Sequence, residues 1–388
     1  MGKTTSGQPP ILGVPLEDLR RDRTSVKWGV HGPDVIPMWI AEMDCAPCPA
    51  VVDAVSAAMV RGDTGYALTE EYAAELAAFA EAEWSWDFDP RTTTRVADVL
   101  SGVTHLLGLF TEVGGPVVVS PPVYNAFYEV IEACGRRVVE APLGPDHRLD
   151  VDGLAEVFAR ETAGGAPTAY LLSNPHNPTG TVHTPAELEA LARVADAHGV
   201  RVLSDEIHGP LVLPTSTFTP YLTVPGTERG VTVTSASKAW NLAGLKAAVI
   251  VPGEDAVDDV RRLHPYVTFG ASHLGVIAQT AAYRDGRAWL RRLVGELDAN
   301  RRLLADLVAE QLPGARLVVP EATYLAWLDL SGLGLGDDPA GEVLRRARVA
   351  LSPGPIFGSG GHGHARVNYA TSPEILREAV DRIASIVD

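Results

Sequence analysis

The sequence predicts an α/β protein with a mostly parallel central sheet in a large domain, plus a smaller α+β domain. Between residues 116 and 251, apolar runs of four or five residues alternate with helical patterns, which is typical of strands that helices cover on both faces. Beyond about residue 284 a long Arg- and Leu-rich helix precedes short mixed strands and helices. We therefore expect an N-terminal arm with part of the small domain at 1–48, a large domain at 49–284, and a C-terminal small domain at 285–388.

The composition is that of an ordinary globular protein, with 388 residues, 46% of them hydrophobic and 21% charged. A net charge of −17 disfavours a nucleic-acid partner, because phosphate contacts need clusters of Lys and Arg. No apolar run approaches the ~18 residues of a membrane span, and the first residues lack the apolar core of a secretory signal. The cysteines, Cys45, Cys48 and Cys134, are few and odd in number, consistent with reduced thiols. These features predict a soluble cytoplasmic protein.

Local signals predict the individual elements. Residues 1–49 are rich in Pro and Gly and indicate an irregular arm. A helix is expected at 49–62, where a proline opens and a glycine closes an apolar i, i+4, i+8 spacing. Thr184 and Glu187 are spaced as a capping box at the start of another helix. Further helices are expected at 70–82, 98–110, 122–134, 289–311, 340–348 and from 373, and strands at 116–119, 169–172, 200–203, 231–233, 247–251, 316–319 and 324–328.

The stretch 231–251 carries the first chemical signal. A β-branched run leads into Ser235, Ala236, Ser237 and Lys238, and a second apolar run begins at 247. A lysine at such a strand end can be partly desolvated, which disfavours its ammonium form and leaves an amine able to form a Schiff base with an aldehyde. The neighbouring serines can donate hydrogen bonds to a phosphate. An ordinary loop lysine would give the same local pattern, so the interpretation depends on the rest of the chain.

Four polar signatures lie where elements are predicted to start or end, and open α/β sheets bind ligands at such places. They are Ser101-Gly102-Val103, the segment 173–180 (SNPHNPTG), the segment 205–208 (DEIH) and the segment 235–238 (SASK). With these signatures the chain resembles the fold type I superfamily of pyridoxal phosphate (PLP) dependent enzymes, aminotransferase class I/II, from about Lys27 to the C-terminus. The branch that it resembles most contains the cystathionine β-lyases and cysteine-S-conjugate β-lyases. The similar motifs lie at 27–28 (KW), 37–44 (PMWIAEMD), 65–66 (GY), 205–208, 237–244 (SKAWNLAG) and 323–329 (TYLAWLD).

The resemblance implies PLP as the cofactor and gives catalytic roles to particular residues. Lys238 would form the Schiff base with the cofactor and later act as the proton-transfer base. Asp205 would keep the pyridine nitrogen protonated, so that the ring can accept electrons, and Tyr124 would stack on the ring. Asn174 would hydrogen-bond the ring hydroxyl and contact the substrate. His208, where many aminotransferases carry a tyrosine, would lie near the same hydroxyl and favours the lyase branch.

The resemblance also implies phosphate and substrate contacts. The phosphate would be bound by the amides of Val103 and Thr104 at a helix start, by hydroxyls and by a lysine; the implied set is Ser101, Gly102, Val103, Thr104, Ser235, Ser237 and Lys246. Tyr66 would reach the phosphate of the neighbouring subunit, which implies a homodimer. Arg366 would bind the α-carboxylate of an amino-acid substrate, with Trp39 and Ala41 at the substrate edge. No metal is expected.

The implied function is a carbon–sulfur β-lyase that converts cystathionine or another cysteine S-conjugate into a thiol, pyruvate and ammonia. A PLP-dependent aminotransferase and a tailoring enzyme acting on a larger S-conjugate are the alternatives. A regulatory protein that has kept only the fold is a third, against which the intact Lys238, Asp205 and Arg366 argue.

Two motifs are interpreted as structural. The glycines at 358–363 match the spacing of a dinucleotide loop, but too little chain follows them for a βαβ unit. We expect a flexible loop that leads to Arg366. Cys45 and Cys48 have redox-motif spacing without the surrounding pattern of a thioredoxin-like fold, and we expect them to be packed or at the substrate edge.

Overall fold

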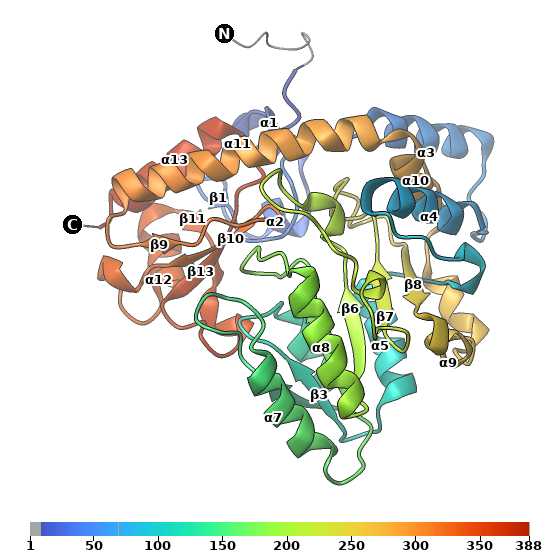
Figure 1. Ribbon diagram of the computed structural model, residues 1–388. Helices are drawn as coiled ribbons and strands as arrows, with labels where there is room; N and C mark the ends of the chain where they lie inside the picture. Colours follow the sequence, from blue (N-terminus) through green and yellow to red (C-terminus); the bar gives the residue numbers. More distant parts are fainter. Residues whose placement is uncertain (1–8, 69, 388) are drawn as a thin grey trace.

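The computed structural model describes residues 9–68 and 70–387, and its centre is a seven-stranded sheet (Figure 1). The strand order is β2-β8-β7-β6-β5-β3-β4. The strands are β2 (Thr94–Val96), β3 (Pro116–Val119), β4 (Arg137–Glu140), β5 (Ala169–Ser173), β6 (Arg201–Asp205), β7 (Val231–Thr234) and β8 (Ala248–Pro252). Strands β4, β3, β5, β6 and β7 are parallel, and β8 is antiparallel to β7 and β2. The prediction of a mostly parallel central sheet is confirmed.

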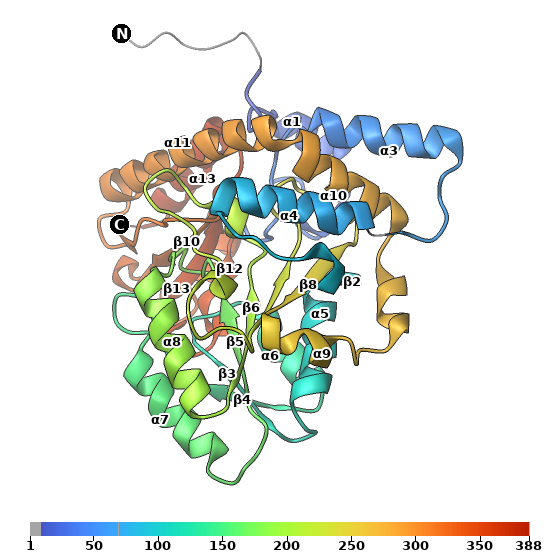
Figure 2. The same ribbon diagram turned by 45° about the vertical axis from the view of Figure 1, so that its right-hand side comes forward.

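Helices cover both faces of this sheet, which explains its uniformly apolar strands. Helices α5 (Val99–Phe110) and α6 (Ala126–Ala133) pack on one face. Helices α7 (Val151–Thr162) and α8 (Pro185–Ala197) pack on the other. Beside them lie α3 (Pro49–Arg61), α4 (Glu70–Trp84) and α10 (His273–Asp285), which share a core with β8 and with the long helix α11 (Arg287–Gln311) (Figure 2).

The C-terminal part forms a second, smaller sheet with the order β12-β13-β10-β9. Its strands are β9 (Arg316–Leu317), β10 (Leu325–Asp329), β12 (Ser352–Pro353) and β13 (His364–Asn368), all antiparallel to their neighbours. Helices α11 and α13 (Pro373–Ala384) pack on it. The N-terminal arm, with α1 (Leu16–Asp22) and α2 (Val26–Gly29), joins this part through a parallel pair of β1 (Ile36–Pro37) with β11 (Val349–Ala350).

Most predicted elements are present, and several others were missed. The capping box of Thr184 and Glu187 is confirmed at the start of α8. Among the elements that the prediction missed are β2, β4, β13, α1, α7 and α10. Helix α10 is buried on most of its surface, so it lacks the polar stripe by which an amphipathic helix is recognised. In the part of the chain that the structure describes, no helix is both long and apolar enough to cross a membrane.

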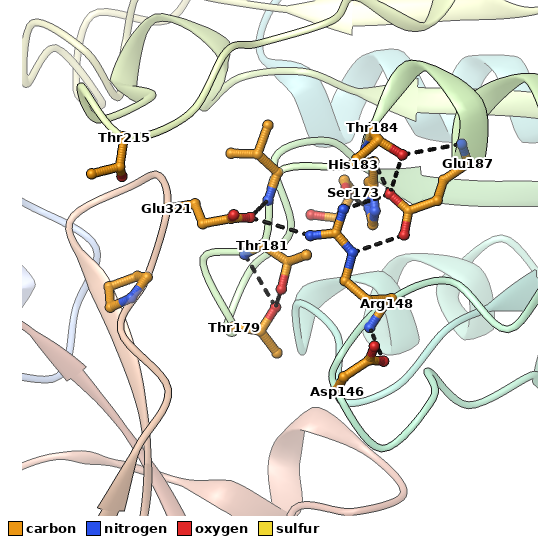
Figure 3. A network of polar contacts seen from close by, with 12 residues as sticks. Asp146, Arg148, Ser173, Thr179, Thr181, His183, Thr184, Glu187, Thr215 and Glu321 are labelled. Carbon is orange, nitrogen blue, oxygen red and sulfur yellow. Dashed lines mark hydrogen bonds and ion pairs between the residues drawn. The ribbon is translucent and has the colours of Figure 1, made fainter.

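The loop after β5 is fixed against the segment that precedes β10 (Figure 3). The Glu321 carboxylate accepts the Val182 amide at 2.9 Å and lies 3.3 Å from the guanidinium of Arg148, which is paired with Glu187. The amide of Glu321 also donates to the Gly180 carbonyl at 2.9 Å. Gly180 has a φ of 72°, and a Cβ there would lie 2.3 Å from a side-chain carbon of the C-terminal part, so the position requires glycine. These contacts position the NPTG segment.

A buried ion pair fixes the conformation of the N-terminal arm. Lys27 Nζ lies 2.8 Å from Asp44 Oδ1, and the two side chains are 1% and 3% exposed. The indole of Trp28 donates to the same carboxylate at 3.0 Å. A buried charge that keeps its partner is tolerated, whereas one that loses its partner is costly. The pair therefore holds residues 27–44 in one conformation.

Substitution of Lys27 by Met should destabilise the protein by about 3–5 kcal/mol, because the Asp44 carboxylate would stay buried without its cation. The loss of unfolding free energy in urea titrations measures this. The matched control is Arg193→Met, which breaks an exposed i, i+4 pair with Glu189 and should change stability far less. Equal losses in the two variants would contradict the importance of the buried pair.

Candidate active site

A cavity lies at the carboxyl ends of β5, β6 and β7, and it brings together many of the predicted residues. Those on its wall are Ala41, Tyr124, Asp205, His208, Ser237, Lys238 and Lys246. The wall also contains Asp98, Val99, Leu100, Ser173, Asn177, Ile207 and Ala243, for which no role was predicted. Parallel strands place their carboxyl ends at one edge, so residues far apart in sequence meet there.

The amine of Lys238 is anchored to a backbone carbonyl. Lys238 Nζ donates to the Ala41 carbonyl at 2.9 Å, and the Tyr324 hydroxyl donates to the same oxygen at 2.9 Å. Burial lowers the pKa of Lys238 to about 8, the charge of Arg366 adds to this, and the Asp205 carboxylate opposes it. A substantial fraction of the amine is therefore neutral near physiological pH and can act as a nucleophile or a base.

The backbone around Ala41 is held by polar side chains from distant elements. Each carbonyl from residue 39 to residue 43 accepts a side-chain hydrogen bond of 2.6–3.0 Å: Trp39 from Arg366 and Ser352, Ile40 from Asn368, Ala41 from Lys238 and Tyr324, Glu42 from Lys27 and Asn368, and Met43 from Asn241. Trp39 thus contacts Arg366 through its carbonyl, while its ring packs on His31 with centroids 5.2 Å apart. The motif's backbone, more than its side chains, organises the site.

Asp205 and His208 are both buried in the wall, and burial shifts their pKa values in opposite directions. Burial raises the pKa of Asp205 to about 7, against the hydrogen bond from the Ile207 amide and the charge of Lys238. A cation beside this carboxylate would favour its ionised form. Burial lowers the pKa of His208 well below its usual value, and the charges of Lys238 and Arg366 add to this. His208 is therefore a neutral imidazole.

Tyr124 follows β3 and also lines the cavity. Its ring lies edge-to-face to Phe127, with centroids 5.5 Å apart. Burial raises the pKa of Tyr124, so its hydroxyl remains protonated. The stacking of Tyr124 on the cofactor ring stays a prediction.

Asn174 was predicted to contact the cofactor and the substrate, but it lies outside the cavity wall, whereas Asn177 lies on it. The Asn174 amide donates to Glu206 at 3.1 Å and to the Thr219 carbonyl at 3.0 Å, so it lies beneath the sheet edge and outside the wall. Asn177 is on the wall, and its side-chain oxygen accepts a hydrogen bond of 3.1 Å from Arg366. Both asparagines occur in one motif, and only the fold shows which of them faces the cavity.

The helix expected at 98–110 is confirmed as α5, but the residues assigned to the phosphate at its start need correction. Helix α5 begins at Val99 with Asp98 as its N-cap, whose carboxylate accepts the Ser101 amide at 2.7 Å. The predicted set Ser101, Gly102, Val103 and Thr104 lies within the helix and is not part of the wall. Gly102 instead allows close packing on β7, because a Cβ would lie 2.9 Å from Val233. The amides at the helix start beside the cavity belong to Val99 and Leu100.

Ser235 and Ser237 differ in position. The Ser235 hydroxyl lies 2.7 Å from the Ala247 carbonyl and 3.0 Å from Gln279 Oε1, so it faces α10 and not the cavity. Ser237 lines the cavity as predicted. Lys246 also lines it, and its ammonium is 2.7 Å from Asp98 Oδ2. Asp98 was not predicted, although an Asp followed by an apolar helical pattern is an N-cap signal.

Arg366, in β13, adjoins the cavity through Asn177 and the Trp39 carbonyl. Its guanidinium carbon is 4.9 Å from the centroid of Phe357. Burial lowers the pKa of Arg366 to about 10, which still leaves it charged at neutral pH. Its Nε has no hydrogen-bond partner among the described residues. A buried donor of this kind suits an anionic ligand.

The loop before β13 is held in place, unlike the flexible loop that we expected. A Cβ at Gly358, whose φ is 89°, would lie 1.8 Å from the Tyr128 hydroxyl. That hydroxyl donates to Glu140 at 2.7 Å, and Ser359 contacts the same carboxylate. The close approach of glycine to tyrosine explains the glycine at this position.

The remaining predicted residues lie away from the cavity. Tyr66 is 88% exposed, with its ring 6.0 Å from Phe269. Cys45 and Cys48 are buried and free, and burial raises the pKa of Cys45 to about 12, so it is an unreactive thiol. Within residues 9–68 and 70–387, no group of three or more His, Cys, Asp or Glu side chains is placed to hold a metal ion.

The residues of this cavity fit PLP. Lys238 offers an amine for the aldehyde, and Asp205 offers a buried carboxylate for the ring nitrogen. The start of α5, with Ser237 and Lys246, offers amides, a hydroxyl and an ammonium for the phosphate. The buried Nδ1 of His208 is without a hydrogen-bond partner in the described chain, and a bound molecule could supply one.

Comparisons with known proteins extend this fit to the whole chain. Residues 33–383 match the family model described as aminotransferase class I and II. A Mycobacterium leprae protein named "Putative cystathionine beta-lyase" is 49% identical over 96% of this chain and 97% of its own length. Cystathionine beta-lyase PatB of Bacillus subtilis is 32% identical over 94% of this chain and 98% of its own.

Among solved structures, a "putative plp-dependent beta-cystathionase" of Corynebacterium diphtheriae superposes with a TM-score of 0.90 and 33% identity, over 97% of this chain and 98% of the other. The family match, these full-length relatives and the shared fold agree with the site geometry. The chain belongs to the aminotransferase class I and II family.

Proposed function

We propose that this protein is a PLP-dependent carbon–sulfur β-lyase, which cleaves cystathionine or another cysteine S-conjugate into a thiol, pyruvate and ammonia. The observation that carries this proposal is the convergence of Lys238, Asp205 and the Arg366–Asn177 pair around one cavity. The full-length similarity to proteins named cystathionine β-lyase supports the reaction class.

In this proposal Arg366 positions the substrate. A guanidinium can bind a carboxylate through two parallel hydrogen bonds. Arg366 is buried and already oriented by Asn177 and the Trp39 carbonyl, so little side-chain entropy is lost when the substrate binds. Arg366 would thus hold the α-carboxylate beside the cavity that Lys238 lines.

Bound PLP supplies an electron sink conjugated with the substrate Cα, which allows the Cα–H bond and then the Cβ–S bond to break. Lys238 removes the α-proton as its neutral amine, and the Ala41 carbonyl then accepts a hydrogen bond from the resulting ammonium. The Asp205 carboxylate would hold the ring nitrogen of PLP in its protonated form. His208, neutral because it is buried, adds no charge to the site.

The main test combines an absorption spectrum with a product assay. The purified protein with PLP should show the visible absorption of bound cofactor and should release pyruvate from L-cystathionine. Lys238→Ala should lose at least about 10³-fold in kcat, because it removes the amine that acts as the general base. Bleaching of the absorption without pyruvate would indicate an aminotransferase instead, and no absorption at all would refute the cofactor assignment.

The pH profile should report the lowered pKa of Lys238. Since only the neutral amine removes a proton, kcat should rise about tenfold per pH unit below pH 8 and level off above it. His208→Gln is the control, because an imidazole whose pKa lies far below its usual value should not produce this limb. A rise of kcat that is complete below pH 7, or one that disappears in His208→Gln, would argue against Lys238 as the titrating base.

We further propose a homodimer in which Tyr66 serves the partner's cavity. Tyr66 is far more exposed than most aromatic side chains and does not line the cavity of its own chain. Other exposed apolar side chains are carried by α3, by the loop after it and by the segment before α10, and these segments lie on the same side of the ribbon (Figure 2). Among these side chains Phe269 contacts both Tyr66 and Tyr266. We call this set of exposed side chains the patch. The patch consists of Val52, Met59, Val60, Tyr66, Leu68, Tyr266 and Phe269. Exposed apolar side chains gathered in this way mark an interaction surface.

Charges in this patch should separate the subunits. Met59→Glu with Val60→Glu should sediment as a monomer and bind PLP more weakly, because each cavity would lose the partner's tyrosine. The control is Val113→Glu, an exposed apolar position outside the patch, which should remain dimeric. Sedimentation of the unchanged protein as a monomer would end this proposal.

Three free cysteines also support a reducing compartment, for which we propose the cytoplasm.

A further inference from the structure

The start of α5 brings a carboxylate to the end of the cavity where the cofactor phosphate is expected. Asp98 Oδ1 accepts the Ser101 amide at 2.7 Å, and Asp98 Oδ2 lies 2.7 Å from Lys246 Nζ. Asp98 and Lys246 both line the cavity, together with Val99 and Ser237. Lys246 and an amide at the start of α5 therefore contact Asp98, and the same kinds of group would contact an anionic ligand.

The Asp98 carboxylate and a bound phosphate would both be negatively charged, so they would compete for the same positive groups. An N-cap aspartate is favourable because its charge faces the positive end of the helix. A phosphate ester with a charge of about −1.5 to −2 would be attracted by that same end. The charges of Asp98 and Lys246, which are paired at 2.7 Å, largely offset each other. The side chains at the start of α5 thus provide little net positive charge for a phosphate.

We propose that Asp98 sets the cofactor affinity of this protein by competing with the phosphate of PLP for Lys246 and for the positive end of α5. The cofactor is consequently held less tightly than the remaining donors allow. This inference rests on the proposed function, because it concerns the cofactor that the function requires. Asp98 acts here as a determinant of ligand affinity, and it takes no part in bond breaking.

The need for a cap acceptor does not by itself require a charged residue at this position. An N-cap needs an acceptor for one helix amide, and Asn or Ser provides it nearly as well as Asp. Asp98→Asn therefore keeps the cap of α5 and removes only the charge. The side chains of Asp98 and Lys246 are 35% and 54% exposed, so the solvent screens their charges partly and a moderate effect is expected.

The test is the Kd for PLP of the apoprotein, prepared by removing the cofactor and titrated by protein fluorescence. Asp98→Asn should bind PLP about three- to tenfold more tightly at low ionic strength, as expected for removal of one partly screened charge. The difference should shrink in 1 M salt, because exposed charges are screened there. Pyridoxal, which lacks the phosphate, should bind equally to both proteins.

Two variants control for folding and capping. Asp150→Asn changes the N-cap of α7, whose carboxylate accepts the Gly153 amide at 3.0 Å outside the cavity wall, and its Kd for PLP should equal that of the unchanged protein. Asp98→Ser provides a second uncharged cap and should also tighten PLP binding. It keeps the test valid if Asp98→Asn folds poorly.

The outcomes separate this inference from the function on which it rests. An unchanged or higher Kd for PLP in both Asp98 variants would overturn it, and a higher value would mean that Asp98 orients Lys246 toward the phosphate. An equal gain for pyridoxal would also overturn it, since the effect would not depend on the phosphate. If the unchanged protein bound neither PLP nor pyridoxal, the proposed function itself would fail.

Discussion

The site depends on the hydrogen bonding of one short backbone segment, residues 39–43. Its consecutive carbonyls accept side chains from the arm, from the loop after β7 and from the C-terminal sheet, among them Lys238, Arg366 and Asn368. A buried carbonyl is costly to leave without a donor, so the segment cannot shift without breaking several bonds at once. The Lys238 amine and the Arg366 guanidinium are positioned by the same few residues, so their positions are coupled.

The order of elements could be predicted from local patterns in the sequence, and the type of site from those patterns together with the family resemblance. Short apolar runs bounded by helices define a parallel sheet, and polar residues directly after those runs lie at one edge of it. Asp205, Ser237 and Lys238 were found in this way. The division of the chain near residues 48 and 284 stays a prediction.

The errors came from positions where a tertiary contact decides between neighbouring residues. Asn174 and Asn177 are three residues apart in one loop, and the acceptors that hold Asn174 come from the end of β6 and from residue 219. Ser235 is directed away from the cavity by Gln279 of α10, a helix that was not predicted. No spacing rule within a single motif contains such information, because the partner lies more than 30 residues away.

Burial without full neutralisation is the common physical feature of the site. The low dielectric lowers the pKa of Lys238 and raises that of Asp205, while the attraction between the two opposes both shifts. An amine in deep isolation would be neutral but unable to keep a proton once it had taken one. The Ala41 carbonyl and the Asp205 carboxylate make the ammonium tolerable, so that Lys238 can alternate between its two protonation states. The pKa values of the site therefore depend on charged and polar partners that are close enough to reduce the shifts caused by burial, but too few to abolish them.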